Sequence, residues 1–449
     1  MLTQLAREES TYSSVFRAQS EQASRTEPHW LRQLRENAFE RFEQVGFPTV
    51  ADEEWKYTNV APIAKTNFAP PTVSSEARLT GENNLARFLL DEAHESQLVF
   101  VNGVFQKELS SFDGLPIAPV DLVAGVRAGQ DESIVLEHLA RYARPDQNGF
   151  TALNTALFSS GAFIRIPSGA KIDAPIHLLF ISGSVDRATP FASFPRALII
   201  VEKGSEATII ESYASVDESR YLNNAIVEMV VSESARLQHF RVQRESPRAF
   251  HVATTKVDVG RNAGYDTTAI NLGAALSRHD IGVMMDHEGA ECRVDGLYMV
   301  DGDQHTDTHS VIDHRQPRCT SHQLYKGILD GKSRAVFNGK VFVRHGAQQT
   351  DARQTNKNLL LSNEAHVDTK PQLEIFADDV KCAHGAAIGQ LDEDEVFYLE
   401  SRGINPALAR NILTYGFAEE VIEKITIDSI KRELDTAVLH RLHASLIVD

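Results

Sequence analysis

Short β-rich runs recur along this chain at a near-regular spacing. From about residue 160, runs of six to ten residues each follow a small and a polar residue, and they begin near residues 169, 204, 234, 262, 289, 333 and 365. The spacing is roughly 30 residues, which is typical of a repeat architecture. One interval of about 44 residues, between 289 and 333, has room for an additional rung with the sequence DQHTDTHSVIDH.

This spacing decides the fold class. Strands so close together leave no room for the long crossover helices of a doubly wound α/β sheet. The pattern therefore predicts a mainly β protein in which short strands coil into a parallel β-helix over residues 146–390, each rung hydrogen-bonded to the next. An ordinary β-sandwich remains the alternative.

The segment before the repeats, residues 1–145, is predicted to form a helix-rich N-terminal cap. Its clearest element is an amphipathic helix that opens at Pro28 and closes at Gly46, a favoured residue just past a helix end. The apolar residues at helical spacing are Leu31, Leu34, Ala38, Phe42 and Val45.

Residues 391–449 are predicted to form a helical C-terminal domain. Asp392 and Asp394 are candidate caps of a short helix that ends at Gly403, and Asn405-Pro406 is typical of the start of another. A last helix begins near Asp428 and repeats an apolar residue every fourth position, a stripe that either packs on a neighbouring helix or binds a partner. The stripe consists of Ile430, Leu434, Val438, Leu442 and Leu446.

Composition limits the classes of partner and the cellular compartment expected for this chain. Lys and Arg total 45 against 62 Asp and Glu, a net charge of −17, so the field of the protein repels phosphate backbones and anionic lipid. We expect no nucleic-acid partner, and no export signal or membrane span is predicted. Three scattered cysteines are too few for a disulfide framework, which favours a reducing, cytoplasmic location.

Histidines and cysteines gather in the second half of the repeats. Nine of the seventeen histidines lie between His279 and His384. The sharper candidate site is Cys382 with His384, because residues two apart on an extended segment project to the same side. A thiolate and an imidazole suit iron or an iron-sulfur cluster, yet two ligands leave the site to be completed from elsewhere.

Three stretches resemble one family. The run FNGKVFVRHGAQQTDARQTNKNLLLSNEAHVDTKPQLEIFADDVKCAHGAAIGQLDEDEVFYLESRGI resembles the C-terminal half of SufD proteins, and RCTSHQLYKGILDGKSRAVFNG and GFPTVADEEWKYTNV extend the match. The resemblance implies a right-handed parallel β-helix between helical terminal domains. It also implies a non-catalytic scaffold subunit that works with its paralogue SufB and the ABC-type ATPase SufC in ATP-dependent iron-sulfur cluster assembly, iron acquisition and transfer to apo-proteins.

The resemblance also assigns sites and cofactors. It implies that His384 is a ligand of a transient iron-sulfur cluster shared with SufB at the interface of the two β-helices, with Cys382 as a supporting ligand. SufB proteins carry Glu-His-Glu at this segment, which favours SufD. The FYLESRGI segment resembles the ATPase-binding region, where Phe397, Tyr398, Leu399 and Arg402 are the expected contacts. A reduced flavin in the complex and a homodimer of the isolated chain remain open.

Two enzymatic alternatives come from other classes. The parallel β-helix often hosts carbohydrate-active enzymes, which would act on a polysaccharide. A stand-alone metalloenzyme would use His305, Asp307 and His309, three side chains that share one face of a strand. The simpler hypothesis for these three residues is that they are ordinary surface side chains.

Overall fold

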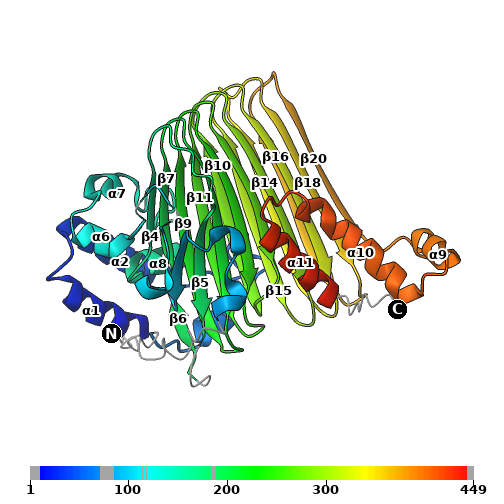
Figure 1. Ribbon diagram of the computed structural model, residues 1–449, viewed down its shortest axis with the longest axis horizontal. Helices are drawn as coiled ribbons and strands as arrows, with labels where there is room; N and C mark the ends of the chain where they lie inside the picture. Colours follow the sequence, from blue (N-terminus) through cyan, green and yellow to red (C-terminus); the bar gives the residue numbers. More distant parts are fainter. Residues whose placement is uncertain (1–10, 71–84, 114, 118, 184–188, 442–449) are drawn as a thin grey trace, which may run out of the picture.

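The strands coil into a parallel β-solenoid of about seven turns, with helices at both ends of the chain (Figure 1). The computed structural model describes residues 11–70, 85–113, 115–117, 119–183 and 189–441. Successive turns pair side by side in two sheets, so that each inner strand bonds to the turn before it and the turn after it. The predicted fold class, mainly β with a parallel β-helix and helical flanks, is confirmed.

The first sheet has the order β2-β1-β5-β8-β10-β12-β14-β16-β18-β20, and all its neighbours are parallel except the β1–β2 hairpin. From β8 onward its strands begin at residues 206, 236, 264, 291, 320, 351 and 381, which is the repeat seen in the sequence. The bounds are β1 (Gln97–Val101), β2 (Val104–Phe105), β5 (Ile176–Ser182), β8 (Glu206–Ser215), β10 (Arg236–Arg244), β12 (Gly264–Asn271), β14 (Glu291–Val300), β16 (Thr320–Leu329), β18 (Asp351–Leu360) and β20 (Lys381–Gly389).

The second sheet has the order β19-β17-β15-β13-β11-β9-β7-β4-β3, with β6 beside β9. Only β3 and β4 are antiparallel in this sheet, at the end opposite β19. The bounds are β3 (Val120–Asp121), β4 (Ala162–Ile166), β6 (Phe191–Ser193), β7 (Arg196–Val201), β9 (Tyr221–Val231), β11 (Phe250–Val259), β13 (Leu276–Met285), β15 (His305–His314), β17 (Arg334–Val343) and β19 (His366–Ile375).

The seven predicted runs do not all belong to one sheet. The first five lie in the first sheet, whereas the runs near 333 and 365 are β17 and β19 of the second sheet. The long interval therefore contains two strands, β15 with the predicted rung DQHTDTHSVIDH, and β16. Each turn contributes a strand to both sheets, and both kinds of strand have similar residues, so periodicity alone does not separate them.

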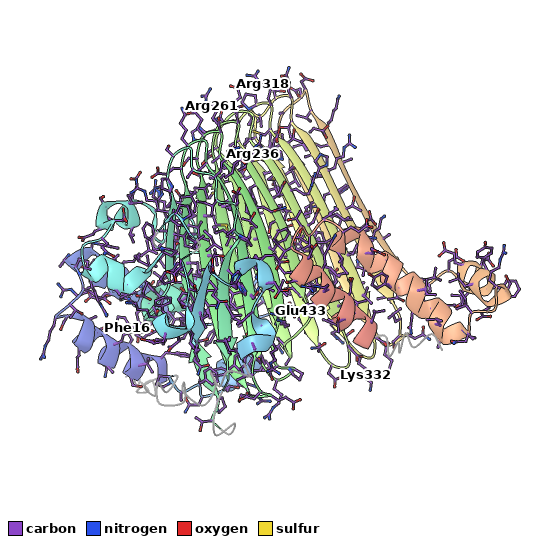
Figure 2. The ribbon with its side chains drawn as sticks, in the orientation of Figure 1. Phe16, Arg236, Arg261, Arg318, Lys332 and Glu433 are labelled. Atoms are coloured by element: carbon purple, nitrogen blue, oxygen red, sulfur yellow. The ribbon has the colours of Figure 1, made fainter. Side chains whose placement is uncertain are left out.

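Short loops close the turns at two opposite edges. Figure 2 shows Arg261 and Arg318, which lie in loops that lead from the second sheet to the first, at one edge. Lys332, in the loop from β16 to β17, lies at the other edge. Because these loops are short, the surfaces available for binding are the outer sheet faces and the ends of the solenoid.

The apolar side chains that point inward form one continuous cluster. It extends from Leu98 on β1 to Val367 on β19. Inside it, two tyrosines on adjacent strands pack over glycines, since Tyr298 is in register with Gly327 and Tyr325 with Gly296. A glycine inside a strand often marks such a close approach.

We predict that Gly327→Ala lowers the free energy of unfolding by about 1–3 kcal/mol, the usual cost of overpacking a dense core. A methyl group there would overlap the ring of Tyr298 and the amide of Asn358. Chemical denaturation followed by circular dichroism measures the effect. Gly385→Ala on β20 is the matched control, because a methyl group there meets nothing within 4 Å. Equal stabilities of the two variants would contradict this packing.

Helices, the strand pair β1–β2 and the short strand β3 make up the described part of the N-terminal region. The strand β1 lies within the region predicted as a cap, yet it extends the first sheet beside β5. The boundary at residue 145 stays a prediction. The helices are α1 (Thr11–Ala23), α2 (His29–Val45), η1 (Glu53–Trp55), α3 (Ala61–Lys65), η3 (Ala86–Phe88), η4 (Asp91–Ala93), η5 (Lys107–Leu109), α6 (Leu122–Arg127), α7 (Glu132–His138) and α8 (Gly149–Leu157).

The helix predicted between Pro28 and Gly46 is confirmed as α2. Pro28 is its N-cap, and Gly46 takes the positive φ of 63° that glycine tolerates. Val45 differs from the prediction, because it is exposed rather than part of the buried stripe. Phe39 is buried instead and stacks on Phe16 of α1, with ring centroids 4.2 Å apart. Figure 2 labels Phe16 beside the N-terminal helices.

In the described part of the chain, three helices follow the solenoid, as predicted. They are α9 (Glu393–Ser401), α10 (Pro406–Ile422) and α11 (Asp428–Arg441). The side chain of Asp392 caps α9 by accepting from the Asp394 backbone, and Asn405 caps α10 by accepting from Leu408. None of the helices in the described ranges has the length and apolar character of a bilayer span.

The apolar stripe of α11 packs on the solenoid itself. Ile430, Leu434 and Val438 join a buried cluster with α10 and the outer face of the first sheet, including Phe240 and Leu297. An ion pair between Arg244 of β10 and Glu433 of α11 adds to this contact. The intramolecular interpretation of the stripe is therefore correct for these residues, although the main surface is a sheet. Leu442 and Leu446 lie outside the described residues.

Candidate functional site

The last turn of the solenoid is open. Within the described chain, β20 pairs only with β18 and β19 only with β17, so each strand leaves one edge without a strand partner. Eight of the nine residues of β20 are exposed, whereas β18 still alternates buried and exposed positions. Such an edge presents a row of backbone donors and acceptors ready to pair with another chain.

Cys382 and His384 lie on this terminal strand, as side chains on its inward face. They are in register with Ala352 and Gln354 of β18, which are both buried in the interior. Cys382 packs partly against the apolar core, and His384 is exposed because no further turn covers it. The predicted common orientation of the two side chains is thus confirmed by the strand geometry.

The Cys382 thiol is not in the thiolate form that binds metals. Burial raises the pKa of the Cys382 thiol, with a smaller contribution from nearby Asp351, so the neutral thiol is favoured. Cys292 lies in the same inward column but three strand intervals deeper, about 14 Å away along the stack. Among the described residues, no group of three or more histidine, cysteine or acidic side chains is placed to hold a metal ion.

Apolar side chains surround the open end. Ile375 ends β19 and is 40% exposed, Phe376 follows it and is 47% exposed, and Ile388 on β20 is 49% exposed. Exposed apolar groups rimmed by polar ones are typical of a protein interface.

The predicted ATPase contacts form a second exposed group on α9, which projects away from the sheets at the right of Figure 1. Phe397 is 68% exposed and Tyr398 is 57% exposed. The Arg402 guanidinium lies over the Tyr398 ring, 5.1 Å from its centroid. Leu399 is the exception, because it packs partly against the buried residues that join α9 to α10.

The three residues of the metalloenzyme alternative do lie together, on the outer face of β15, but around a cation of the protein itself. Arg278 Nη1 donates to Asp307 Oδ2 at 2.7 Å, and His309 Nε2 lies 3.1 Å from Asp307 Oδ1. His305 Nε2 contacts Thr58 Oγ1 at 2.9 Å. A buried guanidinium on the central carboxylate opposes a second cation there, so this arrangement disfavours a metal site.

Electrostatics support this ion-pair network. Burial alone would lower the pKa of His309, but Asp307 and Glu54 outweigh it and raise the pKa to about 9. The hydrogen bond from His309 Nδ1, at 3.2 Å, lowers the pKa of Glu54 to about 2. His309 is therefore protonated at neutral pH and joins the η1 turn to the second sheet.

We predict that this network stabilises the fold in a pH-dependent way. The folded pKa of His309 lies above its usual 6.5, so its contribution is complete below pH 6.5 and is lost as the pH rises through about 9. The stability gap between wild type and His309→Gln should therefore narrow by up to about 3 kcal/mol between pH 6.5 and pH 9.5. Denaturant unfolding at both pH values measures it, and a constant gap would contradict the protonated state.

The features described so far define a class: β-solenoid proteins with helices at both ends of the chain and an open last turn. Comparison with known proteins agrees. Residues 6–178 match the SufBD protein N-terminal region, and residues 182–417 match the SufBD core domain of SUF-system iron-sulfur cluster assembly. The chain belongs to the SufBD family of the SUF iron-sulfur cluster assembly system.

Curated relatives cover nearly the whole chain. An iron-sulfur cluster assembly SufBD family protein of Synechocystis is 38% identical over 94% of both chains. The iron-sulfur cluster assembly protein SufD of Escherichia coli is 33% identical over 89% of this chain and 90% of its own length. SufD of Bacillus subtilis is 27% identical over 92% and 94%.

These matches confirm the predicted SufD resemblance and a role in iron-sulfur cluster assembly. The ligand roles of Cys382 and His384, and the ATPase contacts on α9, stay predictions. Sequence reasoning missed Arg278 and Thr58 as partners of Asp307. The only signal was the position of Thr58 within GFPTVADEEWKYTNV, one of the stretches that carry the family resemblance.

Proposed function

We propose that this chain is the SufD-type subunit of a cytoplasmic complex with a SufB-type paralogue and a SufC-type ABC ATPase. In this proposal it is a non-catalytic scaffold for ATP-dependent cluster assembly and iron acquisition, and the ATPase partner hydrolyses ATP. The observation that carries the proposal is the open last turn with His384 exposed at its mouth. A reduced flavin belongs to the complex in this proposal, with no residue of this chain assigned to it.

The open turn fits a second β-solenoid as partner. A strand of the partner can add to the free edge of β20 or β19 through backbone hydrogen bonds, and its apolar residues can cover Ile375, Phe376 and Ile388. The same edge would also accept a second copy of this chain, which is the homodimer alternative. The SufB-type paralogue is preferred because it would contribute different side chains, and thus the ligands that this chain lacks.

The chemistry at the mouth suits a cluster that must form and then leave. Imidazole is a neutral ligand that titrates close to physiological pH, so it is displaced more readily than a thiolate. His384 is exposed on the edge where a partner would bind, whereas the Cys382 thiol is half-buried with a raised pKa. We therefore assign His384 as the ligand of the cluster and Cys382 as its supporting or alternative ligand.

We predict that His384→Ala in the reconstituted complex reduces cluster loading at least tenfold, since the cluster would lose one of its few protein ligands, while subunit association and ATPase activity persist. Iron and sulfide content, absorbance and size-exclusion profiles separate these outcomes. His366→Ala is the matched control, an exposed histidine on the outward face of neighbouring β19. Normal loading in His384→Ala would refute ligation. Dissociation of the complex would instead show that His384 holds the interface.

The exposed face of α9 supports docking of the ATPase. Phe397 and Tyr398 are the two most exposed large apolar side chains of the described chain, and Arg402 stacks on Tyr398. Aromatic residues and arginine are the commonest hot spots of protein interfaces. By contrast, the C-terminal half of α10 and the stripe of α11 bury their apolar residues against the first sheet, so they hold α9 in place. Ile412 of α10 is 41% exposed, less than either aromatic residue of α9.

We predict that Phe397→Ala combined with Tyr398→Ala weakens ATPase binding by about 2 kcal/mol or more, the scale of interface hot spots. Calorimetric titration of the ATPase into the purified chain measures it. Leu136→Ala is the control, because Leu136 on α7 is equally exposed, at 53%, but lies in the N-terminal region. Point variants are used because removal of the C-terminal helices would expose the apolar face of the first sheet. Unchanged affinity of the double variant would move the ATPase site elsewhere.

A further inference from the structure

A second site lies on the second sheet between β11 and β17, so it ends one strand before the open edge at β19. A cleft of about 250 Å³ opens on the outer face of this sheet, beside the η1 turn. Its lining includes Trp55, Lys256, Arg278, Asn338 and Lys340. The floor is well packed, because Trp55 is 4% exposed and the Arg278 guanidinium lies 3.7 Å above its ring.

The cations of this cleft are compensated unequally. Arg278 is fully engaged, since it donates to both oxygens of Asp280 at 3.0 and 2.8 Å and also to Asp307. Lys340 Nζ lies 3.5 Å from Glu54 Oε1. Within the described chain, the Lys256 amine has neither a hydrogen bond nor an ion pair.

Lys256 is nevertheless held in a defined place. It is in register with Gly282 of β13, and its side chain lies across this glycine. A methyl group at Gly282 would come 2.7 Å from Nζ and 2.9 Å from Cδ of Lys256. Burial lowers the pKa of Lys256, and attraction by Asp280 offsets this only in part. An anion beside this amine would relieve the cost of a half-buried, unpaired charge.

An unpaired acceptor faces the same cleft. The side-chain Oδ1 of Asn338, on β17, is buried and has no hydrogen-bond partner in the described structure. A buried acceptor without a donor costs free energy that a ligand hydroxyl would recover. The cleft therefore combines a free cation with a free acceptor, a pair that matches a ligand carrying both an oxyanion and a hydroxyl.

The spacing sets the size of that ligand. The Lys256 amine already reaches β13, and Asn338 lies two strands further along the sheet and two residues back from Lys340, the register partner of Lys256. The usual strand and residue spacings place it about 12 Å away. Hydrogen bonds of about 2.8 Å at each end leave roughly 6 Å, the length of a small acid of about four or five carbons. We propose that this cleft binds a small hydroxycarboxylate, with a carboxylate on Lys256 and the hydroxyl donating to Asn338 Oδ1.

Malate and succinate test this proposal directly, because they differ only by one hydroxyl group. Calorimetric titration of the purified full chain should give a dissociation constant for malate about tenfold lower than for succinate, the order expected from pairing one buried acceptor. Lys256→Met should weaken both acids at least tenfold. Asn338→Leu should remove the preference for malate while succinate binds as before. Lys332→Met, in the exposed loop after β16, should change nothing.

A covalent footprint provides an independent readout. Malate should protect Lys256 from an amine-acylating reagent by at least fivefold, as read by peptide mass spectrometry, and should leave Lys332 equally reactive. Circular dichroism of each variant shows that its fold is retained. Equal affinity for malate and succinate, no binding of either acid at millimolar concentration, or unchanged binding by Lys256→Met would each overturn the proposal.

Discussion

The structure depends on one constraint: every backbone donor and acceptor of a parallel strand must find a partner on the next strand. Inner turns satisfy it with their neighbours, as in the unbroken register from β8 to β20. At one end the antiparallel additions β2 and β3 finish the sheets, and the N-terminal helices lie beside them (Figure 1). At the other end the described chain ends in two unpaired edges. This asymmetry leaves one end of the solenoid available for association.

The outer faces of the two sheets are subject to a second constraint, the burial of their apolar side chains. An outer sheet face rich in Ile, Leu and Phe must be covered, and α10 with α11 covers the first sheet over β10, β12, β14 and β16. On the second sheet the N-terminal segment takes this role through Trp55 and Phe68, which pack beside Phe250. Once these faces are buried, α9 remains as an exposed helix on a rigid support. A docking element is positioned more accurately by such a support than by a free loop.

Local signals made much of this predictable. The caps Asn405 and Asp392 and the apolar spacing of α2 depend on neighbours in sequence, so they were visible without a structure. The repeat indicated the solenoid, but it did not show to which of the two sheets each strand belongs. The runs that form β17 and β19 were therefore placed in one series with strands of the first sheet, although they belong to the second. The Arg278 network was missed because Thr58 and Asp307 are 249 residues apart and meet only through the coil. The amphipathic pattern of α11 indicated a buried face, but it did not identify the surface that covers this face.

The interior near the open end is lined by uncharged amide side chains. Deeper turns combine apolar side chains with a buried charged network that includes Glu211, His239 and Arg241. In the last turns, β18 instead points the uncharged amides Gln354, Asn356 and Asn358 inward. These amides bond to one another and to neighbouring turns: Gln354 donates to Gln323 at 2.7 Å, Asn358 to Asn356 at 2.7 Å, and Thr369 to Asn356 at 2.8 Å. Hydrogen bonds between defined amide atoms fix one register more strictly than apolar contacts do. They therefore fix β18, the strand on which β20 pairs through its backbone with His384 in register with Gln354.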